Sequence, residues 1–186
     1  MKVNQETNLV NGIDMNTIQA TVAAIEENSQ LGQCRFHVTN KWIDGGHNRT
    51  SVSSFFGAGQ EIEHCQTFEL DADEPPILAG RDLAANPVEH LLHALASCMT
   101  TSMVCHAAVR GIQIDELESQ LEGDLDMSGF LGLSPDVRKG YQNIRIKFKV
   151  KTDDENLEKL KELAEFSPVL DVITNGTSVD IQVEKK

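Results

Sequence analysis

Residues 86–111 read NPVEHLLHALASCMTTSMVCHAAVRG, and this stretch decides the fold. Pro87 suits the first turn of a helix, because the N–H that proline lacks would have no partner there. Gly111 suits the position at which a helix ends. The side chains between them are apolar on nearly every side of such a helix. A helix that is apolar all round is buried in a core or against a partner, so the stretch predicts a long buried helix with Cys98 in its middle.

The composition of the chain limits the kinds of partner that it can bind. The 186 residues fit one domain, or one large and one minor lobe. The balance of 16 Lys+Arg against 29 Asp+Glu gives a net charge of -13. Negative charge repels nucleic acid phosphates and anionic membrane surfaces, so we expect neither nucleic acid nor a membrane as a partner.

The first residues and the cysteines indicate the compartment. Residues 1–8 are polar and lack the apolar core of a signal peptide. No segment has the ~18 uninterrupted apolar residues of a membrane span. The four cysteines show no CxxC spacing, which favours free thiols over disulfides in a cytosolic protein. We therefore predict a cytoplasmic protein.

The rest of the chain predicts short elements around the long helix. Apolar residues at helical spacing, or alternating with polar ones, mark each element. Helices are expected over 15–28, 153–166 and 167–172, and strands over 34–39, 50–56, 67–70, 114–126, 144–150 and 178–183. Residues 44–48 form a hairpin turn, and residues 1–14 a loose tail with a turn at Asn11-Gly12. This order predicts an α+β fold with mainly antiparallel strands.

Cys98 is the strongest candidate for chemistry. The thiolate is the reactive form, and a free cysteine has a pKa of ~8.5. A position in the middle of a helix gains little from the helix dipole, and apolar surroundings raise the pKa. Cys98 is therefore reactive only beside a cation. Glu89 is a candidate to hold such a cation, and Arg49 or Arg81, from the same chain or a partner chain, is the candidate cation. Without it, Cys98 is a small core residue.

Two other groups of residues carry weaker signals. His90 and His93 share a helix face, and with Cys98 or His106 they have the right chemistry for zinc. Packed or exposed histidines are the commoner reading when no cysteine pair accompanies them. Residues 57–60 form a glycine turn that is too short to cradle a phosphate. We therefore predict no metal and no other cofactor.

The run from Asn86 to Cys98 resembles the signature of the OsmC/Ohr family (osmotically inducible protein C and organic hydroperoxide resistance proteins). There, NP-x-E-x-L precedes a helix of small residues that carries the peroxidatic cysteine. The similarity continues in residues 111–117, 121–125 and 166–169, and extends from about residue 30 to the end. It implies an OsmC-like domain over 31–186, preceded by a tail and helix over 1–30. It also implies an intertwined homodimer, with antiparallel sheets wrapped around long buried central helices.

The resemblance also implies a reaction, the thiol-dependent reduction of a small organic hydroperoxide. The peroxidatic thiolate attacks the O–O bond and becomes a sulfenic acid. A second cysteine then forms a disulfide, which an external dithiol reduces. By residue matching, Cys98 takes the peroxidatic place. Glu89 takes the place that holds the arginine, which is Arg49 or Arg81 here.

One departure from the family pattern concerns the second cysteine. The family has a Cys-Pro-Val run where this chain has Ser167-Pro168-Val169. Serine cannot form a disulfide, and Cys105 lies ~10 Å along the helix from Cys98, beyond the ~7 Å limit between the Cα atoms of a bridged pair. We therefore expect a weak, one-cysteine thiol peroxidase that uses a small thiol as reductant. The alternative is a non-enzymatic OsmC-like dimer that binds a small apolar ligand.

Overall fold

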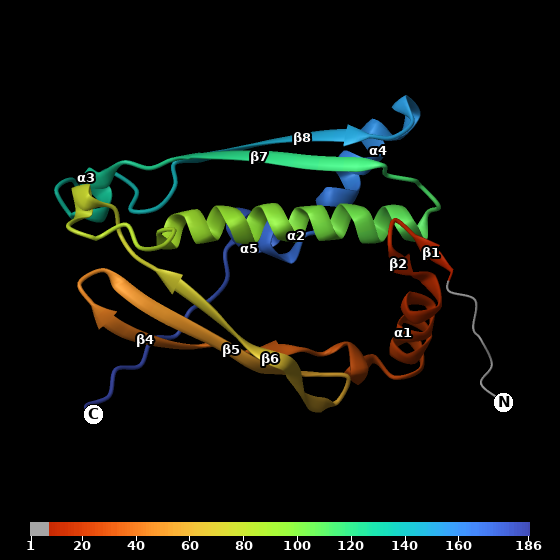
Figure 1. The fold of residues 1–186 in the computed structure, drawn as a ribbon, viewed down its shortest axis with the longest axis horizontal. Coiled ribbons are helices and arrows are strands. Elements are labelled where there is room, and N and C mark those ends of the chain that lie inside the picture. The colour runs from red at the N-terminus through yellow and green to blue at the C-terminus, as the bar shows by residue number, and fades with distance from the viewer. Residues whose placement is uncertain (1–7) are drawn as a thin grey trace. The chain divides into compact units, whose positions relative to one another are not determined.

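The computed structural model describes residues 8–186, which form two compact units (Figure 1). Of the described residues, the first unit contains 8–9 and Asp14–Leu91, and the second contains Val10–Ile13 and Leu92–Lys186. Helix α2, Pro87–Val109, contributes residues 87–91 to the first unit and the remainder to the second. The helix predicted from the opening stretch is confirmed. The predicted division of the chain at residues 30 and 31 stays a prediction.

The N-terminal segment differs from the expected loose tail. Residues 1–7 lie outside the described part of the chain, but β1 (Leu9–Val10) and β2 (Ile13–Asp14) form a small two-stranded sheet. The predicted turn at Asn11-Gly12 is confirmed, with positive φ at both residues. Helix α1 (Met15–Glu27) follows, as predicted. Asp14 caps it, because its carboxylate accepts hydrogen bonds from the Asn16 N–H and the Thr17 hydroxyl.

The first unit contains an antiparallel sheet built on the long strand β5. Its strands are β3 (Arg35–Phe36), β4 (Thr39–Asp44), β5 (His47–Gly57) and β6 (Gln60–Ala72). The predicted hairpin turn is confirmed but is shorter, because β5 already begins at His47, and the strand expected over 34–39 is divided between β3 and the start of β4. The strand expected only over 67–70 is much longer. Ala58 and Gly59 both have positive φ, so the chain reverses in two residues and all of β6 follows β5 back.

The second unit packs helices on one face of a two-stranded antiparallel sheet. After α2 come β7 (Glu116–Asp124), the short helix α3 (Met127–Phe130), β8 (Asn143–Lys151), α4 (Leu157–Ala164) and α5 (Pro168–Asn175). Short 3-10 helices occur at Ser29–Gly32, Pro76–Leu78 and Asp154–Asn156. The core joins apolar residues of α2 and α4, namely Leu95, Met99, Met103, Ala107, Leu160, Leu163 and Ala164. Alternating apolar residues of β7 and β8 pack against it.

Helix α2 is buried along one side only. Leu95, Met103 and Ala107 are buried, whereas Leu91 is 40% and Val109 51% exposed. By length and composition alone α2 is apolar enough to cross a membrane, a test that the core helix of a soluble protein also passes. Since its buried side forms the core of the second unit, we interpret α2 as a core helix.

The strand predicted over 178–183 is wrong. No helix or strand follows α5 within the described chain. The alternation of apolar and polar residues is that of a strand, but a strand also needs a hydrogen-bonded neighbour. The apolar side chains of the segment, Val179, Ile181 and Val183, are 76%, 80% and 92% exposed.

Candidate functional site

Cys98 lies in the middle of α2, in the second unit. Its side chain is half-buried and its thiol is free, as are the thiols of Cys34, Cys65 and Cys105, which agrees with the prediction of free thiols. The helix dipole acts only in the terminal turns, so it does little for this thiol. Any activation of Cys98 must come from a side chain brought to it.

Glu89 caps the helix that carries Cys98. The Glu89 carboxylate accepts a hydrogen bond from the Asn86 N–H at 2.8 Å, and the Asn86 side chain accepts one from the Glu89 N–H at 2.8 Å. This reciprocal pair is a capping box, and it stabilises the start of α2. Cys98 follows nine residues later, which in an α-helix means about 13.5 Å along the axis and the opposite face.

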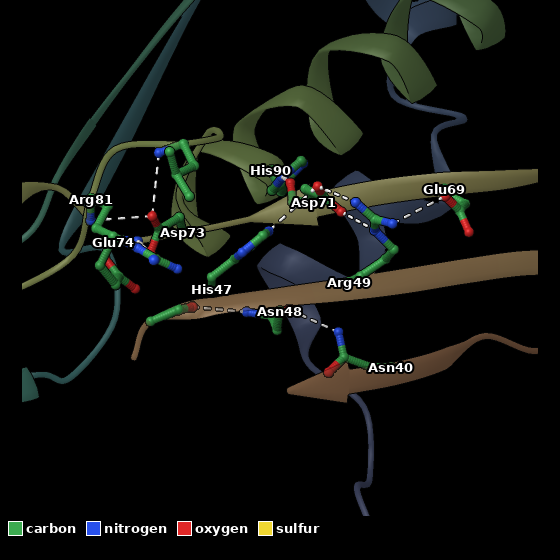
Figure 2. A network of polar contacts seen from close by, with 12 residues as sticks. Asn40, His47, Asn48, Arg49, Glu69, Asp71, Asp73, Glu74, Arg81 and His90 are labelled. Atoms are coloured by element: carbon green, nitrogen blue, oxygen red, sulfur yellow. Dashed lines mark hydrogen bonds and ion pairs between the residues drawn. The ribbon is translucent and has the colours of Figure 1, made fainter. Parts of the chain in front are cut away.

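Arg49 pairs with Asp71 in the first unit (Figure 2). The guanidinium donates two hydrogen bonds to the carboxylate, from Nε at 2.5 Å and from Nη2 at 2.8 Å, and its Nη1 lies 3.5 Å from a carboxylate oxygen of Glu69. The hydrogen bond from Arg49 lowers the pKa of Asp71 from 3.8 to about 2. The pair in turn raises the pKa of Arg49, so this guanidinium stays charged.

Two histidines converge on the same aspartate. His47 Nε2 lies 3.4 Å from Asp71 Oδ2, and its side chain is only 13% exposed. His90, at the start of α2, donates from Nε2 to the backbone carbonyl of Asp71 at 2.9 Å. Figure 2 shows both rings directed toward Asp71. The sequence did not indicate this group, because residues 71–76 resemble an acidic loop and only the full length of β6 brings Asp71 opposite Arg49.

Arg81 projects from a loop that a buried aspartate organises. The Asp73 side chain is 1% exposed and accepts hydrogen bonds from the backbone N–H groups of Glu74, Arg81 and Leu83 at 2.9, 3.1 and 3.2 Å. Burial acts to raise the pKa of Asp73, but these N–H groups outweigh it and hold the pKa below its usual value. The Arg81 guanidinium lies 3.5 Å from the exposed carboxylate of Asp44.

Each predicted partner of Cys98 thus has other polar partners within the first unit. The structure brings Arg49 together with Asp71, His47 and His90, while Arg81 contacts Asp44 and Glu89 contacts Asn86. The assignment of Glu89 and an arginine to Cys98 stays a prediction.

Two of the histidines considered as metal ligands, His90 and His106, have structural contacts. In residues 8–186, no three His, Cys, Asp or Glu side chains lie close enough together to hold a metal ion. His106 packs its ring against Phe166, with centroids 4.3 Å apart. Burial, together with the charge of Arg110, lowers the pKa of His106.

Ser167, the first residue of the Ser167-Pro168-Val169 run, has a structural role. It is buried, and its hydroxyl oxygen accepts a hydrogen bond from the Leu170 N–H at 3.2 Å. Pro168 occupies the first turn of α5 behind it. Ser167 is therefore the N-cap of α5.

Comparison with known proteins agrees with this fold. Residues 80–182 match the family model described as OsmC-like protein. An OsmC-like protein from Mycoplasma pneumoniae has a similar solved structure, with a TM-score of 0.55 and 17% sequence identity, over 75% of this chain and 87% of that one. An organic hydroperoxide resistance protein OsmC from Legionella pneumophila gives 0.53 and 18%, over 76% and 91% of the two chains. No curated protein matches the sequence.

Proposed function

Because the chain belongs to the OsmC-like family, we propose that it reduces organic hydroperoxides through the thiol of Cys98. The observation that carries the proposal is the free, half-buried thiol in the middle of α2, nine residues after the Glu89 of the Asn86–Glu89 signature. The family match covers α2 and the second unit from Leu92 through residue 182. The function named for the similar Legionella protein, organic hydroperoxide resistance, is consistent with this chemistry.

The reaction needs only one cysteine. The Cys98 thiolate attacks the peroxide oxygen, the O–O bond breaks, the alcohol leaves, and the thiol becomes a sulfenic acid. A small thiol then displaces water from the sulfenic acid and forms a mixed disulfide. A second thiol attacks that disulfide, which releases a small-molecule disulfide and restores Cys98. Ser167 supplies no second sulfur, so turnover depends on how easily the small thiol reaches Cys98.

The cation beside Cys98 is proposed to be Arg49 or Arg81, ordered by Glu89. Since Glu89 and Cys98 lie on opposite faces of one helix, Glu89 of one chain is better placed to act on Cys98 of a second copy. Either arginine would first have to exchange its present carboxylate partner. We propose that the active site is completed in a cytoplasmic homodimer.

Apolar side chains exposed on the surface support a homodimer. Monomeric proteins rarely expose large contiguous apolar patches. The sheet of the first unit has large exposed apolar side chains, namely Phe36, Trp42 and Leu70, and Val38 between β3 and β4 is exposed as well. The segment 178–183 keeps the alternation of a strand but has no strand partner in residues 8–186, so it is suited to extend a sheet of the second copy.

The second candidate is a non-enzymatic dimer that binds a small apolar ligand. Two observations favour it, the capping serine at position 167 and the engagement of both arginines with other carboxylates. In that case Cys98 would be a packing residue, and the protein would bind an alkyl compound without consuming it.

Turnover separates the two candidates. The full-length protein is supplied with cumene hydroperoxide and a small dithiol, and loss of the hydroperoxide is followed. Cys98→Ser should abolish the catalysed rate, whereas Cys105→Ser, at another half-buried site on the same helix, should keep it. Equal rates for the wild type and Cys98→Ser would reject the enzymatic proposal.

The arginine is tested by alkylation of Cys98 at neutral pH. Glu89→Gln and single substitutions Arg49→Gln and Arg81→Gln should slow the alkylation if the replaced residue belongs to the site. Asp44→Asn is the control for Arg81, because it removes the present ion-pair partner and leaves the arginine free. Alkylation at the wild-type rate in all three variants would rule out an arginine-activated thiol.

A further inference from the structure

The second unit contains an apolar cavity of about 480 Å³ that the hydroperoxide chemistry does not use. Residues of α2, β8, α4 and α5 line it, and Cys98 is not among them. Its walls include Met99, Met103, Phe148 and Leu160. Pockets that bind small molecules typically span ~300–1,000 Å³ and combine apolar walls with a few polar groups. The cavity has this size and composition.

Only two charged residues line the cavity, Lys161 and Glu165. Lys161 Nζ donates a hydrogen bond to the Glu158 carboxylate at 3.2 Å, so its charge already has a partner. In the described part of the chain, the Glu165 carboxylate has neither a hydrogen bond nor an ion pair. The charge without a partner at this cavity is therefore negative.

The C-terminal end of α4 also favours a cation at this cavity. Glu165 is the residue that follows the last helical turn, at the C-cap. The aligned peptide dipoles give a helix C-terminus a partial negative charge, which favours cations and disfavours a carboxylate. The last carbonyl groups of α4 accept hydrogen bonds from the N–H groups of Glu165, Phe166 and Ser167, and each carbonyl oxygen keeps a second lone pair for a ligand. Glu165 and the helix end thus offer one cation two favourable interactions.

We propose that this cavity binds an amphiphilic primary amine. The alkyl chain lies among the apolar walls, and the ammonium group lies against Glu165 and the last carbonyl groups of α4. A primary amine has a pKa near that of lysine, ~10.4, and is charged at neutral pH. The site requires only the second unit, so its occupation does not depend on the reactivity of Cys98.

The test is calorimetric titration of the full chain at pH 7 with octylamine, decylamine, decan-1-ol and decanoate, each below its aggregation concentration. Decylamine should bind more tightly than decan-1-ol, and decanoate most weakly. Each added methylene should tighten binding about fourfold if the chain is fully buried, so octylamine should be weaker than decylamine by up to about fifteenfold.

Two variants on α4 locate the ammonium group. Glu165→Gln should weaken decylamine binding about two- to fivefold, the range expected for an exposed ion pair, and leave decan-1-ol unchanged. Glu162→Gln is the matched control, because its carboxylate pairs with Lys159 and does not line the cavity. Equal effects of the two substitutions would overturn the proposed contact with Glu165.

A variant in the wall locates the alkyl chain. Leu157 lines the cavity and is 47% exposed, so Leu157→Trp narrows the cavity without disturbing the deepest core. It should weaken decylamine and decan-1-ol alike. Tighter binding of decanoate than decylamine would assign the site to Lys161 and an anionic ligand, and would overturn the proposal. So would the absence of binding by all four compounds, which would indicate that another protein segment covers the cavity.

Discussion

Arg49 and Asp71 lie directly opposite each other on β5 and β6, and their side chains form an ion pair through two hydrogen bonds. The pair joins the two strands of one long hairpin at the end far from its turn, and His47 and His90 contact the same aspartate. This arrangement makes Asp71 the centre of the polar network in the first unit, and makes its ionisation a determinant of stability.

The first prediction is a pH dependence of folding. The pKa of Asp71 is lowered from 3.8 to about 2, so its contribution to stability is complete above about pH 4 and is lost as the pH falls through about 2. The stability difference between the wild type and Asp71→Asn should therefore be constant above pH 4 and shrink below it. Urea unfolding at a series of pH values measures this. Asp180→Asn, in the C-terminal segment, is the control, and a difference that does not vary between pH 4 and 2 would contradict the assignment.

The second prediction concerns the cap of α5. Ser167→Ala removes the acceptor of the Leu170 N–H in a buried place, and should lower the free energy of unfolding by about 1 kcal/mol, within the ~0.5–2 kcal/mol found for such caps. Chemical denaturation measures the change, with the C-terminal Ser178→Ala as the control. If the two variants are equally stable, Ser167 does not cap the helix.

The third prediction places a thiol at position 167, where the resemblance to the OsmC/Ohr family leads us to expect a second cysteine. Ser167→Cys should form a disulfide with Cys98 after one equivalent of an organic hydroperoxide, if Pro168 holds that position beside α2. The wild type should form no intramolecular disulfide. Mass spectrometry of non-reduced peptides detects both. A disulfide from Cys98 to Cys105 or Cys65 in the wild type would show that the chain keeps a two-cysteine cycle by another route.

How far the sequence predicts the fold depends on the range of the interactions. Local signals sufficed for α2, with Pro87 and Gly111 at its ends, and for α1 and the alternating strand β8. Local signals failed where the pairing of strands determines whether and how far a strand forms. Strand β6 is long because a two-residue turn returns it along β5, whereas residues 178–183 have a strand pattern but no neighbouring strand in residues 8–186.

The candidate site shows the same limit. The sequence singled out Cys98, because a thiol inside an apolar helix stands out and the surrounding motif resembles a known family. It did not reveal the group around Asp71, because His47, Asp71 and His90 come together only through the register of β5 and β6 and the packing of the first turn of α2. The capping roles of Glu89 and Ser167 agree with local signals, because Glu three residues after Asn is typical of a capping box and Ser before Pro is typical of a helix start.

The fourth prediction is a stable homodimer. Stable dimers of this kind commonly bury more than ~2,000 Å². The exposed apolar side chains of the first unit and the strand-like segment 178–183 are expected to lie in that interface. Sedimentation at low micromolar concentration should give a dimer, and deletion of residues 178–186 should weaken it. A folded wild-type monomer under these conditions would contradict the dimer and the shared site.

The most direct test of the central claim is the second-order rate constant for reaction of Cys98 with cumene hydroperoxide at pH 7, followed by trapping the sulfenic acid with dimedone. If the protein is a thiol-dependent hydroperoxide reductase, Cys98 should react at least about a hundredfold faster than free cysteine, the lower end of what a positioned catalytic group contributes. The trapped sulfenic acid should be confined to Cys98, with Cys34, Cys65 and Cys105 unmodified. A rate no faster than that of free cysteine, or equal labelling of the four thiols, would show that Cys98 is a packing residue.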